Sequence, residues 1–326
     1  MKKIFLIVSL LIAASCYGHP GIGIVRDSKG NIYYTDLKQV WKLTARGEKT
    51  VVVPGVHTHE LYIDANDNLF GEHLWYNGEK LNTWGYYAWC LKNDGSLVKT
   101  KEPAEGFPSD YGFARDAVGN MYWVERFTLS RFMKKSPDGK IIKLAEGKFG
   151  FIGWLYCTED GTIYFTESDR LQKLTQDGKF AVAADHIRSK VTDFSMMGHQ
   201  YDGYGIWTDQ ESNIYIAMIA GKKINRISRD GKIKTIYTSH TLWTPCSGLF
   251  DKNGTLWVLE NSVTNKVRVR KISKDELNMG MNETKIFSSK THLGVTFLTG
   301  LAIVITLLLL KLVIKKKRLK LQKQTS

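Results

Sequence analysis

The stretch Asp27-Ser-Lys-Gly30-Asn31-Ile-Tyr-Tyr34 decides the fold of this chain, because its pattern returns along the sequence. An aspartate is followed by two spacer residues, a turn dipeptide, and alternating aromatic and aliphatic residues. The pattern recurs as DANDNLF (64–70), DAVGNMYW (116–123), DQESNIYI (209–216) and DKNGTLWV (251–258), and TEDGTIYF (158–165) has threonine in place of the aspartate. Six units therefore recur every 37 to 52 residues, a period typical of repeat architectures.

Each turn dipeptide predicts a hairpin, because Asp and Asn bond the local backbone and Gly adopts positive φ without strain. The residues after each turn alternate as in a strand. Most units contain a second turn further along, at residues 93–95, 137–140, 176–179 and 229–232. Two hairpins per unit give four strands, which is the composition of a propeller blade. The sequence predicts an all-β, six-bladed β-propeller over residues 19–274.

The stretches GIGIVRDSKGNIYYTD (21–36) and VWKLTARGEKTVVV (40–53) resemble an NHL repeat. The strands IYFTE (163–167) and LWVLE (256–260) are similar to blades of the senescence-marker/gluconolactonase and streptogramin-lyase propellers. The resemblance extends from Gly21 to about Ile272. It implies the propeller architecture strongly and the activity weakly, because many activities share this scaffold.

Residues 1–18 have the composition of a secretory signal peptide. Lys2 and Lys3 precede the apolar stretch 4–14, and small residues follow. An alternative is that Ala13-Ala-Ser-Cys16 serves as a lipidation site at Cys16.

Residues 293–314 predict one C-terminal transmembrane helix. The uncharged part, 293–310, would span about 27 Å as a helix, close to the thickness of a bilayer core. The basic tail 315–326 follows, and positive charge collects on the cytoplasmic side. We therefore expect a single-pass protein of the cell membrane with an extracytoplasmic propeller and a cytoplasmic tail. Residues 275–292 would be either a strand that closes the ring or a stalk.

The net charge of +14 does not indicate nucleic-acid binding. Seven basic residues lie from Lys311 onward and two lie in the signal, which leaves about +5 for the remaining domain. Cysteines are few, and Cys90 and Cys157 are expected to be small buried side chains.

Histidines are concentrated in the loops expected on one face of the propeller. The densest group is His57-Thr-His59-Glu, together with Glu72-His73. If residues 57–59 are extended, His57 and His59 point the same way. With His73 they could bind a divalent metal such as calcium, zinc or iron. The alternative is that they are ordinary hydrogen-bonded loop histidines.

Acidic residues follow the second strand of five units: Asp36, Glu72, Glu125, Glu167 and Glu260. Gathered at the channel mouth, they would have raised pKa values or require a cation. Glu72 and Glu125 are the candidate catalytic residues. The alternative is that each acid caps its own turn.

Further candidates for ligand binding lie in the same loops. Trp75 and Trp84 belong to an aromatic insertion at 73–89, and a second insertion covers 186–204. Long loops of this kind are often functional. The complete set of ligand-binding candidates is Trp75, Trp84, Arg126, Glu167, His199, His240 and Glu260.

Two functions remain open from the sequence. One is a module that binds a ligand or protein partner on its loop face. The other is a divalent-metal-dependent hydrolase or lyase of the lactonase type. The chain has no nucleophile elbow, phosphate loop or HExxH zinc helix, so the sequence does not establish that it is an enzyme.

Overall fold

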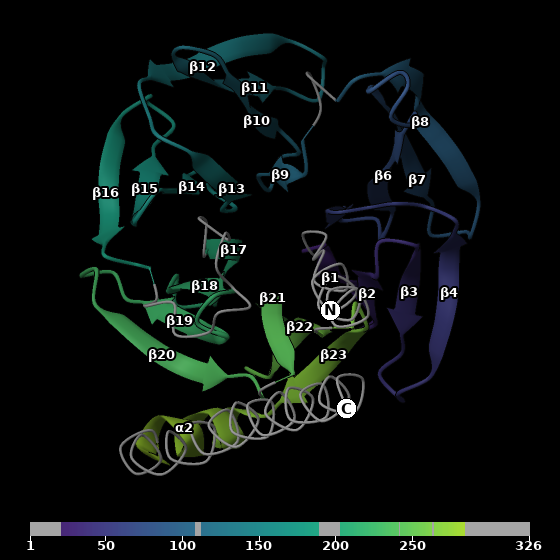
Figure 1. Cartoon of the computed structure of the whole chain (residues 1–326). Helices are drawn as coiled ribbons and strands as arrows, with labels where there is room; N and C mark the ends of the chain where they lie inside the picture. Colours follow the sequence, from purple (N-terminus) through teal and green to yellow (C-terminus); the bar gives the residue numbers. More distant parts are fainter. Residues whose placement is uncertain (1–20, 108–111, 189–202, 241, 263, 284–326) are drawn as a thin grey trace, which may run out of the picture. The chain divides into compact units, whose positions relative to one another are not determined.

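The computed structural model describes residues 21–107, 112–188, 203–240, 242–262 and 264–283. The propeller strands form six antiparallel sheets, each built from strands consecutive in sequence. Figure 1 shows the first strand of most blades near the centre of the ring and the fourth strands at its periphery. The predicted six-bladed propeller is therefore confirmed.

The first three blades contain four strands each. Their bounds are β1 (Ile24–Arg26), β2 (Ile32–Thr35), β3 (Gln39–Leu43) and β4 (Lys49–Pro54); β5 (Leu61–Ile63), β6 (Leu69–Tyr76), β7 (Trp84–Leu91) and β8 (Leu97–Glu105); and β9 (Ala114–Arg115), β10 (Met121–Arg126), β11 (Ser130–Lys135) and β12 (Ile141–Gly147).

The fourth and fifth blades also contain four strands, whereas the sixth contains three. Their bounds are β13 (Ile152–Cys157), β14 (Ile163–Glu167), β15 (Arg170–Leu174) and β16 (Phe180–Asp185); β17 (Gly203–Thr208), β18 (Ile214–Met218), β19 (Lys223–Ile227) and β20 (Ile233–Thr238); and β21 (Trp243–Phe250), β22 (Leu256–Ser262) and β23 (Val267–Ile272).

The repeated aspartate holds the first hairpin of the blade together. In blade three, Asp116 accepts the backbone N–H of Asn120 at 2.8 Å with Oδ1, and the Asn120 side chain and the Tyr122 hydroxyl with Oδ2. Gly119 supplies a φ of +87° in the turn. Blades one and five repeat this arrangement from Asp27 and Asp209. The motif recurs because one carboxylate satisfies three nearby donors.

The core lies between adjacent blades. Phe132 of blade three packs against Phe165 of blade four, with ring centroids 4.7 Å apart. Ile32 and Tyr34 of blade one pack with Leu259 of blade six, so the first and last blades meet through side-chain packing. Cys90, Cys157 and Cys246 are buried free thiols, as expected for the first two.

Residues after β23 form helix α2 (Lys274–Glu283), which replaces any closing strand over that range. Its start is capped reciprocally. The Ser273 hydroxyl accepts the N–H of Glu276, and the Glu276 carboxylate accepts the N–H of Ser273. Within the described ranges, no helix is both long and apolar enough to cross a membrane. The predicted segments 1–18, 293–314 and 315–326 lie outside those ranges.

Strand direction defines two faces of the propeller. The loop face carries the connections between second and third strands and those between blades, including residues 55–60, 77–83 and 127–129. The chain enters at this face, where the N–H groups of Ile22 and Gly23 donate to the carbonyl of His59. The hairpin face carries the repeated aspartate turns. β23, a third strand, ends at the hairpin face, so the chain leaves the propeller opposite the loop face.

Candidate active site at the channel mouth

Glu72 is a buried carboxylate on β6 beneath the loop that enters β5. Its side chain is 5% exposed. Oε1 of Glu72 accepts the backbone N–H of His59 at 2.6 Å. Oε2 of Glu72 is buried without a hydrogen-bond partner. Burying a carboxylate oxygen without a hydrogen-bond partner costs folding free energy. The environment of Glu72 is therefore unusual.

Three side chains fix the backbone around Glu72. The Thr58 hydroxyl and the indole N–H of Trp89 both donate to the carbonyl of Glu72, at 2.5 and 3.0 Å. The hydroxyl of Thr35 in blade one donates to the carbonyl of Thr58 at 2.7 Å. Thr35, Thr58 and Trp89 are all buried, so the loop and the strand are locked together.

Glu60 immediately precedes β5, the innermost strand of blade two, and keeps part of its surface accessible. The pKa of Glu60 is raised to about 8, chiefly by burial and also by the charge of Glu72, whereas Arg126 opposes the shift. Burial also raises the pKa of Glu72 to about 7, partly offset by its backbone hydrogen bonds. The charge of Glu72 disfavours ionisation of Glu60. We call Glu60 and Glu72 the carboxyl pair; near neutral pH it holds a proton.

His59 is neutral at the same pH, because burial lowers its pKa to about 4. Its Nδ1 lies 3.5 Å from Oε1 of Glu72, too far for a strong hydrogen bond. The contact therefore joins a neutral imidazole to the carboxyl pair and is not an ion pair.

Arg126 brings a positive charge to the carboxyl pair from blade three. It ends β10, and its Nη2 donates to the carbonyls of Ile152 and Gly153 at 3.1 and 3.3 Å. Burial lowers the pKa of Arg126, and Glu60 acts in the opposite direction. The site thus combines groups from blades two, three and four.

The three histidines predicted to bind metal do not form a metal centre. His73 Nδ1 accepts the backbone N–H of His57 at 2.8 Å, and its ring packs near Trp75 and Tyr87. Residues 56–60 form no strand, so the alternation expected for His57 and His59 does not apply, although their rings lie 4.6 Å apart. Among the residues with a described placement, no group of three His, Cys, Asp or Glu side chains is arranged to hold a metal.

Most of the predicted carboxylate ring has local partners. Asp36 accepts the Trp41 indole N–H and the N–H groups of residues 38 and 39. Glu167 binds the N–H of Gly150 and the side chain of Gln172. Glu260, fully buried, accepts the Tyr237 and Ser239 hydroxyls and pairs with Arg268 at 2.7 Å.

These acids cap turns or join strands, which is the alternative that the sequence left open. Glu125 lies opposite Arg131 in the β10–β11 pairing. It is not part of the carboxyl pair.

The other predicted ligand-binding residues are dispersed. Trp75 donates its indole N–H to Asn77 and lies over Gly85, where a Cβ would be 2.2 Å from the ring. His240 is exposed, and its carbonyl accepts the N–H of Trp243. His199 lies outside the described residues. Trp84 is partly exposed beside Tyr76 and Phe107.

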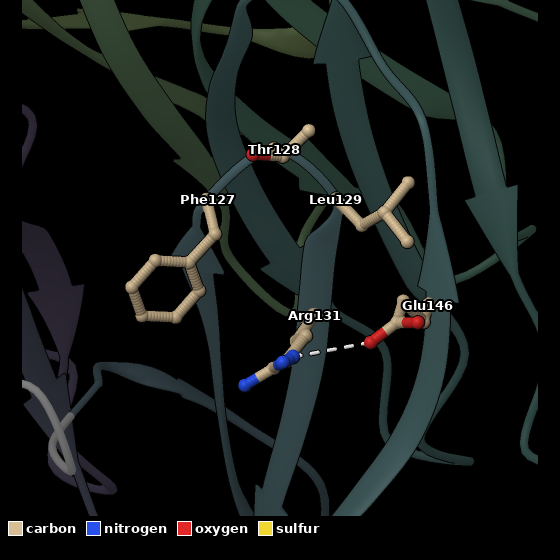
Figure 2. A pocket seen from close by; sticks show the side chains of 5 residues that line it. All are labelled: Phe127, Thr128, Leu129, Arg131 and Glu146. Atoms are coloured by element: carbon tan, nitrogen blue, oxygen red, sulfur yellow. Dashed lines mark hydrogen bonds and ion pairs between the residues drawn. The ribbon is translucent and has the colours of Figure 1, made fainter.

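Glu60 was not among the predicted catalytic residues, although it belongs to the histidine-rich group at 57–60. Its position directly before an inner strand was the available signal. A surface hollow of about 390 Å³ at the β10–β11 tip was also not anticipated. Figure 2 shows its lining by Phe127, Thr128, Leu129, Arg131 and Glu146, with the Arg131–Glu146 ion pair across it.

Comparison with known proteins supports the fold alone. The chain is similar to the structure of a gluconolactonase from Xanthomonas campestris, at 12% identity and a TM-score of 0.52, covering 74% of this chain and 83% of that one. Virginiamycin B lyase from Staphylococcus aureus matches at 17% identity and 0.45, covering 78% and 84%.

A calcium-binding protein, regucalcin, from Agrobacterium tumefaciens matches at 16% and 0.46, covering 74% and 81%. No family model and no curated protein sequence matches the chain. The chain is a six-bladed β-propeller structurally like the gluconolactonase, regucalcin and virginiamycin B lyase structures.

Proposed function

We propose that the chain is a hydrolase that cleaves a lactone or ester at the channel mouth. The observation that carries this proposal is the carboxyl pair, whose pKa values of about 7 and 8 lie close to neutral pH. General acid–base catalysis is most efficient when the catalytic pKa lies near the working pH. The structural similarity to a gluconolactonase is consistent with the proposal but carries only the fold.

The proposed reaction uses Glu60 as base and then as acid. In its ionised form Glu60 takes a proton from water as the water oxygen attacks the ester carbonyl. The protonated Glu60 then donates this proton to the departing alkoxide when the acyl C–O bond breaks. The products are the carboxylic acid and the alcohol, or a hydroxy acid from a lactone.

The other groups stabilise charge during this reaction. The guanidinium of Arg126 would interact with the oxyanion that forms on the carbonyl oxygen. Glu72 does not contact substrate in this scheme. It raises the pKa of Glu60 and anchors the loop that carries it.

The sequence predicted that this activity depends on a divalent cation. The side chains that the structure describes do not form a site for such a cation. His73 already accepts a backbone N–H, and no trio of suitable ligands is present in the placed part of the chain. No step of the proposal therefore runs through a metal.

Hydrolysis of 4-nitrophenyl acetate and δ-valerolactone by the purified protein tests the proposal. We expect a rate that rises with pH around pH 7–8 and falls at least 100-fold in Glu60→Gln. Glu167→Gln is the control, because this acid ends the second strand of its blade and bonds Gly150 and Gln172. The hydrolase proposal is rejected if neither substrate is hydrolysed faster than in buffer alone, both by chelator-treated protein and by protein with added calcium, zinc or iron.

A second proposal is that the loop face binds a ligand or partner while residues 293–314 anchor the chain in the cell membrane. The exposed aromatic side chains of the loop face favour this function. Protease digestion of intact cells tests the arrangement: loss of the propeller with retention of the tail is expected, and protection of both would contradict it.

A further inference from the structure

The innermost strands of blades four, five and six share an irregularity. The pairing of β13 with β14 shifts register within residues 152–155, and that of β17 with β18 shifts within 203–206. The pairing of β21 with β22 shifts within 245–247. Over the residues that the structure places, the pairings of β1, β5 and β9 with their second strands have no such shift. Bulges re-aim side chains and are frequent beside active sites, so this half of the ring differs from the other.

Two glycines in these bulges allow a side chain to approach the backbone closely. A Cβ at Gly153 would lie 2.3 Å from Oγ1 of Thr166. A Cβ at Gly205 would lie 2.4 Å from Oγ of Ser247 in the next blade. Thr166 and Ser247 are buried, and the Thr166 hydroxyl accepts the N–H of Trp154 at 3.3 Å. A glycine inside a strand marks such a close approach. The bulges are therefore held in place by specific packing.

Trp154 and Tyr204 lie within the first two bulges, on neighbouring blades. The centroids of their rings are 5.7 Å apart, and the ring planes are tilted by 47°. Tyr204 also packs against Ile219 and Ala220, in the connection between β18 and β19 on the loop face. Both aromatic residues keep part of their surface accessible. The bulges thus bring two rings together at the loop-face end of the inner strands, and we call Trp154 and Tyr204 the aromatic pair.

A direct contact joins the aromatic pair to the proposed catalytic site. Nη2 of Arg126 donates to the carbonyl of Gly153 at 3.3 Å, and this carbonyl belongs to the peptide bond that leads into Trp154. The charge of the same guanidinium acts on the carboxyl group of Glu60. The groups follow one another from blade two to blade five in the order Glu60, Arg126, Trp154, Tyr204.

We propose that the aromatic pair binds the aromatic ring of a lactone, ester or carboxylate whose carbonyl group lies at Arg126. As a substrate preference, this rests on the proposed hydrolase; as a binding site, it does not. An aromatic ring can stack on one member of the pair while it meets the edge of the other, and such contacts add to the hydrophobic gain. The guanidinium of Arg126 supplies the charge for a carboxylate or an oxyanion. A polyhydroxylated ring is disfavoured, because the hydrophobic cluster around Tyr204 consists of Ile219 and Ala220.

Calorimetric binding of phenylacetate and cyclohexylacetate to the full-length protein in detergent tests the site without requiring turnover. The two anions have the same carbon skeleton, and only phenylacetate has an aromatic face. We expect phenylacetate to bind roughly five-fold more tightly. Trp154→Leu and Tyr204→Leu should each remove this preference, whereas Trp154→Phe should retain most of it. The control Trp41→Leu removes a partly buried indole from the third strand of blade one and should bind as the wild type does.

Hydrolysis of isochroman-3-one and δ-valerolactone separates this inference from the proposed function. Both are δ-lactones of an alkyl alcohol, and water opens isochroman-3-one to the hydroxymethyl derivative of phenylacetate. A higher KM for isochroman-3-one alone in Trp154→Leu supports both proposals. A preference for phenylacetate without hydrolysis of either lactone retains the aromatic pair and rejects the hydrolase.

Two results would overturn the role of the aromatic pair. One is equal affinity for phenylacetate and cyclohexylacetate in the wild type, or an unchanged preference in both leucine variants; hydrolysis of both lactones would then retain the hydrolase alone. The other is tighter binding of gluconate than of phenylacetate, which would favour a polyhydroxylated ligand.

Discussion

The backbone nitrogen of His59 lies 2.6 Å from Oε1 of Glu72, so a strand carboxylate anchors the loop that enters the neighbouring inner strand. The arrangement buries Glu72 while leaving Glu60 partly accessible at the channel mouth. The position of the loop and the pKa of Glu60 are therefore coupled through the Glu72 side chain.

The carboxyl pair should make the propeller less stable as pH rises from 6.5 to 8.5. Both folded-state pKa values, about 7 and 8, lie above the ordinary 4.5, so their contribution is complete below pH 4.5 and is lost as pH rises through 7 and 8. His59 acts in the opposite direction, since its pKa is lowered to about 4, but only below pH 6.5. The loss should be about 2 kcal/mol.

Urea unfolding at pH 6.5, 7.5 and 8.5 measures this slope. Glu72→Gln removes one titrating group and lowers the pKa of Glu60, so its stability should change less with pH. Equal slopes in the wild type and Glu72→Gln would show that the pair does not hold the proton.

Arg268→Ala should destabilise the propeller by about 3 kcal/mol, because it leaves the buried charge of Glu260 without its cation. Arg268 also lies over the ring of Trp243, 3.9 Å from its centroid. Arg131→Ala is the control, since its partner Glu146 is partly exposed. If Arg268→Ala and Arg131→Ala both lower the urea midpoint only slightly, the buried Glu260 does not need Arg268 for stability.

Gly71→Ala should destabilise blade two by at least about 2 kcal/mol through overpacking. A Cβ at this position would lie 2.2 Å from the Trp89 ring, which is buried and cannot move freely. Trp89→Phe reduces the ring, so Gly71→Ala/Trp89→Phe should be more stable than the sum of the single changes predicts. Strict additivity in thermal unfolding would argue against this contact.

Asp116→Ala should cost about 2 kcal/mol, because four donors in the hairpin lose their acceptor. The comparison is Asp94→Ala, whose exposed carboxylate bonds only the neighbouring turn at Ser96; we expect no measurable change there. If both variants unfold at the wild-type urea concentration, the repeated aspartate does not stabilise the blade.

The fold could be predicted from sequence because its key contacts are local. Asp27 and Asn31 are four residues apart and bond each other directly, so the repeat in the sequence is the repeat in space. The end of the ring was harder to predict. Nothing in residues 274–283 alternates clearly, and the capping pair Ser273–Glu276 starts a helix there.

The site was predicted only in part, because burial and pairing depend on residues distant in sequence. Glu72 and Arg126 were identified by position, and both belong to the cluster. Glu167 and Glu260 occupy corresponding positions, yet Glu167 bonds Gln172 and Glu260 pairs with Arg268, local partners that strand alternation does not reveal. His57 and His59 looked like metal ligands because an extended strand was assumed where the chain forms a loop.

Infrared difference spectroscopy of the carboxyl groups between pH 5 and 9 tests the account most directly. The wild type should show a protonated carboxyl signal that persists at pH 6.5 and disappears by pH 9, and Glu72→Gln should shift the remaining signal to lower pH. A spectrum in which every carboxyl group is ionised above pH 5.5 would contradict the shared proton and remove the basis of the proposed chemistry.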